Sequence, residues 1–96
     1  MSREVDALRA AIGENDRAIV AAVNERLRLV ARLWQLKRDL GVDRLDPDRE
    51  RSLRAELAAT NRGPLSAQEL DRLVDELLAL TKRELGGDGA SRLDVR

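Results

Sequence analysis

Two basic residues, Arg26 and Lys37, are placed so that their side chains can bind an anion. Arg26 falls on a line of helical positions that is otherwise apolar, and a guanidinium buried there needs an anionic partner because an unpaired buried charge is costly. Lys37 follows eleven residues later, close to three helical turns, so it returns to nearly the same face about 16 Å along the axis. The two side chains can bracket a small dianion. The alternative is that Arg26 bends outward into water.

A second group of charged residues lies in the sequence DPDRE, residues 46–50. Asp46 is a typical N-cap, and Asp48 and Glu50 add negative charge that favours the start of a helix. Arg49 carries the opposite charge in the same turn, where the helix dipole disfavours it. We therefore expect Arg49 to meet a carboxylate.

The composition excludes many other chemistries. The 96 residues suffice for one small domain, and 18 basic residues balance 18 acidic ones, which argues against a nucleic-acid partner. The sequence has no Cys and no His, which excludes disulfides, thiolate nucleophiles, histidine acid–base catalysis and zinc sites of the usual ligands. No apolar run approaches the roughly 18 residues of a membrane span, and the N-terminus lacks the apolar core of a signal peptide. The sequence therefore predicts a cytoplasmic protein with no nucleic-acid, membrane or metal partner.

A long first helix, from about Arg3 to Leu40, must position the two basic residues. Such a helix is on the order of 55 Å long, whereas a compact chain of this length is about 25–30 Å across. The rest of the chain cannot cover it, and a second copy is the simplest partner. Arg9 lies about 25 Å before Arg26 along the axis, so it can reach such a pocket only in the other copy. Apolar residues dominate a seven-residue repeat whose two seam positions are Val5, Ile12, Ile19, Arg26, Leu33 and Leu40, and Leu8, Asn15, Ala22, Leu29 and Leu36.

Two shorter helices follow the long one. Gly41 ends the first helix, and Asp46 with the proline after it begins the second, which runs to near Thr60. Ser66 caps a third helix, which carries a leucine-rich face and ends at the paired glycines 86–87. The pattern predicts an all-α fold of three helices in each chain.

The predicted assembly is a homodimeric helical bundle, built from one long N-terminal helix plus two shorter helices per chain. Residues 1–87 form the helical domain, and residues 88–96 are predicted to be a disordered C-terminal tail because they have little to bury. Trp34, the only aromatic residue, is expected in the bundle core or the dimer interface, and the alternative is that it contacts the substrate.

The helix plan and the charged residues resemble the all-α chorismate mutase family over about residues 5–85. The resemblance implies an isomerase (an intramolecular transferase) that converts chorismate to prephenate by a Claisen rearrangement in phenylalanine and tyrosine biosynthesis. It implies no metal and no cofactor, and an intertwined homodimeric six-helix bundle with two equivalent sites. The residues that carry the resemblance are Leu8-Arg9, Ile12, Asp16, Glu25-Arg26, Lys37 and Asp46-x-x-Arg49-Glu50.

The same resemblance implies roles for these residues. Arg26 and the partner's Arg9 would bind the two carboxylates of the substrate. Lys37 would donate to a carboxylate and to the ether oxygen, on which negative charge grows as the C–O bond breaks. Glu50 and the region of Asp46 would hold the ring hydroxyl.

Arg49 and the third helix complete the implied site. Arg49 would support the carboxylate-binding field, and Thr81 matches a small hydroxyl residue of the family pattern. Four residues later the family has a Gln or Glu that contacts the ether oxygen, but Leu85 stands there in this chain. Either a slight rotation brings Glu84 in as a protonated acid, which shifts activity towards acid pH, or Leu85 occupies the position and one donor is absent.

Chorismate mutase is thus the predicted function, and two alternatives stay open. One is a related mutase or lyase that acts on aminodeoxychorismate or isochorismate with the same dianion-binding residues. The other is a catalytically weak helical dimerisation or regulatory module that binds a partner enzyme of the shikimate pathway.

Overall fold

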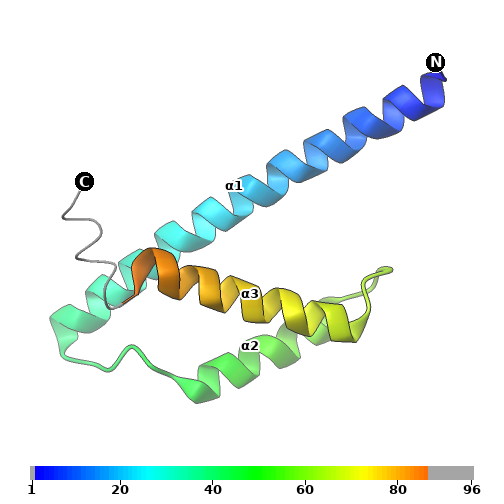
Figure 1. Ribbon diagram of the computed structural model, residues 1–96. Helices are drawn as coiled ribbons and strands as arrows, with labels where there is room; N and C mark the ends of the chain where they lie inside the picture. Colours follow the sequence, from blue (N-terminus) through cyan, green and yellow to red (C-terminus); the bar gives the residue numbers. More distant parts are fainter. Residues whose placement is uncertain (1, 87–96) are drawn as a thin grey trace.

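The computed structural model describes residues 2–86 and consists of three helices in this part of the chain (Figure 1). They are α1 (Arg3–Leu40), α2 (Pro47–Thr60) and α3 (Ala67–Leu85). The all-α class and the predicted helix boundaries are confirmed. The tail predicted for residues 88–96 and the boundary of the domain at residue 87 lie outside the described residues.

Local capping explains where α1 begins and ends. The Ser2 hydroxyl accepts a hydrogen bond from the backbone N–H of Glu4 at 3.1 Å, which satisfies a donor that the helix itself cannot pair. At the other end Gly41 adopts a φ of 71°, a left-handed conformation that costs glycine little. Its N–H donates to the Arg38 carbonyl at 3.1 Å, and the N–H of Val42 donates to the Lys37 carbonyl at 2.8 Å.

The two shorter helices are capped as the sequence predicts. The Asp46 carboxylate accepts from the backbone N–H of Arg49 at 3.0 Å, and Pro47 occupies the first helical position. The Ser66 hydroxyl accepts from the backbone N–H of Glu69 at 3.2 Å at the start of α3.

Helix α3 lies against both other helices, so it connects the fold. Figure 1 shows α2 and α3 as a hairpin that meets α1 at the C-terminal end of α3 and diverges from it towards the turn between α2 and α3, so the N-terminal half of α1 stands apart. The side chains that this packing buries among the described residues are Val74, 2% exposed, and Thr81, 4% exposed, both on α3. A single chain therefore has very little core.

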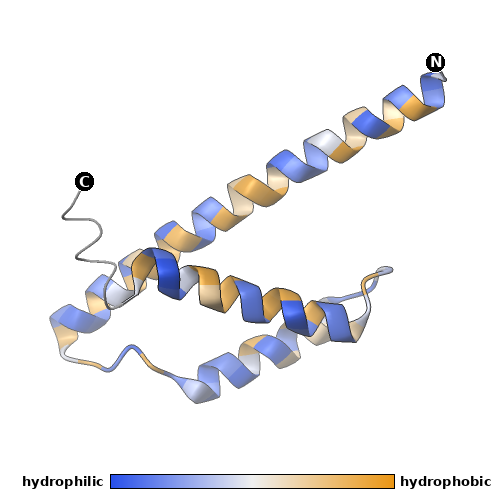
Figure 2. Ribbon diagram, in the orientation of Figure 1, coloured by the Kyte–Doolittle hydropathy of each residue, from blue (hydrophilic) through white to orange (hydrophobic). Residues whose placement is uncertain are grey.

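The long helix leaves most of its apolar seam uncovered. Leu8 is 64% exposed, Ile12 58% and Leu29 54%, and Figure 2 shows hydrophobic residues recurring along α1 beyond the reach of the hairpin. The chain is 58 Å long with a radius of gyration of 17.2 Å, against about 12 Å for a compact domain of this size. None of the described helices is both long enough and apolar enough to cross a lipid bilayer.

Candidate active site

A cavity of about 380 Å³ lies where the C-terminal half of α1, the connector before α2, the start of α2 and the second half of α3 meet. Five of the lining side chains are basic and two are acidic, so the cavity has an excess of positive charge. The basic side chains are Arg26, Lys37, Arg44, Arg49 and Lys82; the acidic ones are Asp46 and Glu50; Thr81 and apolar residues, among them Val30, Leu33, Trp34 and Leu78, complete the wall.

Arg26 points into this cavity and not outward into water. Its guanidinium donates a hydrogen bond to the Thr81 hydroxyl oxygen at 2.6 Å, across the contact between α1 and α3. The Thr81 hydroxyl in turn donates to the carbonyl of Leu77 at 2.7 Å. Because a neutral hydroxyl leaves the positive charge of Arg26 uncompensated, the guanidinium can still take an anion.

Lys37 lines the same cavity and is held by the connector. Its ammonium donates to the backbone carbonyl of Arg44 at 3.4 Å, a long bond that leaves two further N–H donors. The guanidinium of Arg44 stacks over the Trp34 ring, 4.5 Å from its centroid. Trp34 therefore stands in the cavity wall, and its expected place in the bundle core or dimer interface stays a prediction.

The first turn of α2 supplies the acidic part of the cavity together with Arg49. Arg49 does meet a carboxylate, that of Glu56 at 3.9 Å, but both side chains are well exposed and such a pair is weak. The guanidinium of Arg49 can therefore leave Glu56 and bind an anion in the cavity. The carboxylate of Asp46 already accepts one hydrogen bond as the N-cap of the helix.

Glu50 is linked to α3 through Arg54. Arg54 contacts Glu50 at 3.5 Å, Asp75 at 2.6 Å and Asp71 at 3.1 Å, so it ties the start of α2 to α3. The pKa of Arg54 is raised above its ordinary value, chiefly because Asp75 accepts a hydrogen bond from it. Arg54 thus stays charged wherever the protein can be assayed, and its position stabilises that of Glu50.

Six of the residues singled out in the sequence come together in this cavity, and three do not. Arg9 lies about 25 Å before Arg26 along the continuous helix α1, so it is far from the cavity of its own chain. Glu84 and Leu85 are not among the lining residues. Those that come together are Arg26, Lys37, Asp46, Arg49, Glu50 and Thr81.

Glu84 and Leu85 lie in the last turn of α3, C-terminal to the residues of this helix that line the cavity. At about 100° per residue, Glu84 lies about 60° round the helix from Thr81 and about 120° from Leu78, so it stands at the edge of the face that α3 turns towards the cavity. Leu85 shares the face of Leu78 but lies at the last residue of α3, one turn beyond Thr81. Which of the two serves the position that the sequence left open between them stays a prediction.

Arg44 and Lys82 are cavity residues that sequence reasoning missed. Lys82 follows Leu78 by four residues, so helical spacing alone offers a signal for it once Leu78 is known to face the cavity. No comparable signal exists for Arg44, because a connector without periodic structure does not reveal which way its side chains point.

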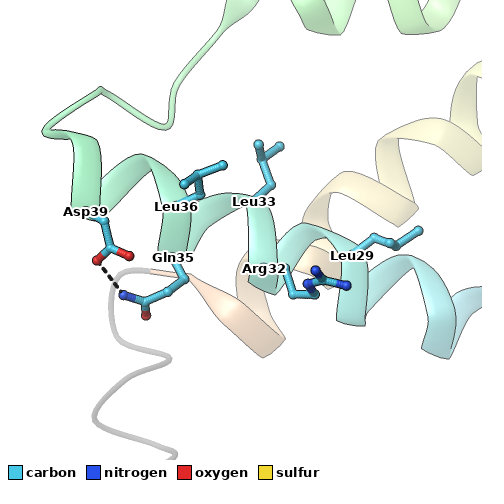
Figure 3. Close-up of a pocket in the computed structure, with 6 residues that line it drawn as sticks. All are labelled: Leu29, Arg32, Leu33, Gln35, Leu36 and Asp39. Carbon is cyan, nitrogen blue, oxygen red and sulfur yellow. Dashed lines mark hydrogen bonds between the residues drawn. The ribbon is translucent and has the colours of Figure 1, made fainter.

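A second, shallow hollow of about 580 Å³ lies on the outer face of α1 (Figure 3). All of its lining side chains come from one helix, with Leu33 and Leu36 pointing to the same side and Asp39 accepting a hydrogen bond from Gln35 at 2.9 Å. One helix cannot enclose a ligand, and the hollow belongs to the uncovered seam. Among the described residues, no group of side chains is arranged to hold a metal ion.

Comparisons with known proteins agree with this geometry. The family model for chorismate mutase type II matches residues 8–84. The structure of chorismate mutase (form I) from Thermus thermophilus superposes with a TM-score of 0.77 at 32% identity, over 82% of this chain and 99% of that one. Form II of the same enzyme gives a TM-score of 0.76 at 32% identity, over 82% of this chain and 90% of that one. No curated protein sequence matches the chain.

Proposed function

The chain belongs to the chorismate mutase type II family, and its activity is that of a chorismate mutase. We propose that the cavity between its three helices is the site at which chorismate is converted to prephenate. The observation that carries the proposal is the positively charged cavity between α1, α2 and α3. The rearrangement is intramolecular, so it needs neither a nucleophile nor a proton donor to start. It needs a folded substrate conformer and positive charge where negative charge develops.

Arg26 and Lys37 do most of this work in the proposed mechanism. The guanidinium of Arg26 binds a substrate carboxylate through two parallel hydrogen bonds, and Thr81 keeps the side chain turned inward. Lys37 turns from the Arg44 carbonyl to the ether oxygen, on which charge grows as the C–O bond breaks. The charge on that oxygen is greatest in the transition state, so the ammonium stabilises the transition state more than the ground state.

The first turn of α2 holds the other side of the substrate in this proposal. Glu50, steadied by Arg54, accepts a hydrogen bond from the ring hydroxyl, together with the carboxylate of Asp46. Arg49 leaves its weak pair with Glu56 and adds to the field that attracts the dianion.

A second copy of the chain completes each site. The exposed seam of α1, from Val5 to Leu40, calls for a partner of matching length, and an antiparallel α1 of a second copy has that length. In such an intertwined homodimer Arg9 is carried to the cavity of the partner, where it binds the second carboxylate. The cytoplasmic location and the association with another enzyme of the pathway, both expected from the sequence, remain predictions.

The direct test is turnover of chorismate by the purified chain. Loss of the ultraviolet absorbance of chorismate, with identification of prephenate as the product, is the expected result. Consumption of isochorismate or aminodeoxychorismate in preference to chorismate would contradict the proposed substrate.

The shared site predicts complementation between two inactive variants. Arg9→Ala and Arg26→Ala damage the same site from different chains, so each homodimer is nearly inactive. A mixed dimer keeps one site in which both residues are intact. Equal amounts refolded together are expected to recover about a quarter of wild-type activity, since half of the dimers are mixed and each has one intact site of two.

Analytical ultracentrifugation of each variant controls for loss of the dimer. A mixture of two dimeric variants that is no more active than the sum of its components would contradict the placement of Arg9 in the partner's site.

A further inference from the structure

The contribution of α3 to the cavity differs from what the sequence suggested. Three of its residues line the cavity, namely Leu78, Thr81 and Lys82. The hydroxyl of Thr81 is engaged on both sides, because it accepts from Arg26 at 2.6 Å and donates to the Leu77 carbonyl at 2.7 Å. The ammonium of Lys82 is therefore the charged group that α3 presents to a ligand within the described chain.

Lys82 is also close enough to Arg26 to contact an anion bound there. Neighbouring Cα atoms are about 3.8 Å apart, so Lys82 begins beside Thr81, whose hydroxyl already touches Arg26. A lysine side chain has a flexible four-carbon stem, and its ammonium can reach an anion that Arg26 holds.

The ammonium of Lys82 has no ion-pair or hydrogen-bond partner among residues 2–86. The adjacent Arg83 behaves differently, because it faces away from the cavity and pairs with Glu76 at 2.6 Å. The carboxylates of Asp71 and Asp75, further along α3, are engaged by Arg54. Lys82 thus adds uncompensated positive charge to the rim of the cavity.

We propose that Lys82 is a further substrate-contacting residue, which donates a charged hydrogen bond from α3 to the bound dianion. This inference rests on the proposed function of the cavity. Lys82 supplies the polar contact that Leu85, an apolar residue one turn beyond Thr81, cannot supply. Because an ammonium donates without first having to be protonated in acid, the site does not require the acid pH that a neutral carboxyl donor from Glu84 would impose.

The test compares Lys82→Met with Arg83→Met. Both substitutions remove one positive charge from neighbouring residues of α3 and leave a flexible apolar side chain, but Lys82 alone lines the cavity. Lys82→Met is expected to lower kcat/KM for chorismate by about 10- to 100-fold, as the loss of a charged hydrogen bond does. Arg83→Met is expected to stay within about twofold of wild type, and Lys82→Arg to recover part of the loss because it keeps a charged donor.

Binding is measured separately by titrating prephenate and following the fluorescence of Trp34, the only aromatic residue and part of the cavity wall. The dissociation constant is expected to rise about tenfold or more in Lys82→Met and to remain unchanged in Arg83→Met. Equal effects of the two substitutions on turnover and binding would overturn the assignment of Lys82.

The same experiment separates this inference from the function on which it rests. A wild-type chain that turns over chorismate and loses activity in Arg26→Ala, but not in Lys82→Met, overturns the role of Lys82 alone. A wild-type chain without turnover overturns both.

Discussion

Replacement of Arg26 by alanine is expected to lower kcat/KM for chorismate by about 100- to 1,000-fold. The guanidinium is the charged group that α1 turns towards α3, where it meets only the neutral hydroxyl of Thr81 at 2.6 Å. A substrate carboxylate supplies the anion that this environment lacks. Arg26 contacts the substrate before and during the reaction, so the substitution is expected to raise KM as well as to lower kcat.

Arg28→Ala is the matched control for this substitution. Arg28 lies on the same helix two residues later, is exposed, and pairs with Glu25 at 3.1 Å on the outside of α1. Its removal is expected to leave the kinetic constants nearly unchanged. The thermal midpoint of Arg26→Ala is expected to equal or exceed that of wild type, because the substitution removes a charge that is half-buried without a counter-charge. Near-normal turnover by Arg26→Ala would refute the assigned role.

Lys37→Met is expected to lower kcat by about 100- to 1,000-fold with a much smaller change in KM. The ammonium is proposed to serve the ether oxygen, whose negative charge exists fully only in the transition state, so its loss affects the chemical step more than substrate binding. The effect differs from that of Arg26→Ala, which is expected to change KM as well as kcat. Two cations that line the same cavity thus control different kinetic constants. Steady-state kinetics with chorismate measures both constants.

Arg38→Met controls for the loss of charge at this end of α1. Arg38 is the next residue in the chain, but it points outward and donates to Gln35 at 2.6 Å. We expect it to retain full activity. If Lys37→Met raised KM and left kcat intact, Lys37 would be a residue for ground-state binding and the proposed contact with the ether oxygen would be wrong.

Local interactions explain why the helices could be predicted from the sequence. The caps at Ser2, Asp46 and Ser66 and the left-handed turn at Gly41 involve atoms no more than a few residues apart, so their geometry follows from the residues present. The spacing of Arg26 and Lys37 on one face of α1 is equally local, because a continuous helix sets it. The dianion chemistry could be predicted for the same reason, whereas the family was predicted from the resemblance of the ordered charged residues and the helix plan.

The tertiary structure decided which groups of α3 and of the connector meet those two residues. Each step along a helix turns a side chain by about 100°, so whether Lys82, Glu84 or Leu85 faces the cavity depends on how α3 packs against α1 and α2. Burial of Val74 and the contact of Thr81 with Arg26 set that rotation, and they bring Lys82 to the cavity. The stacking of Arg44 on Trp34 likewise joins residues that no helical period relates. Such contacts depend on packing between segments distant in the chain, which local sequence patterns do not encode.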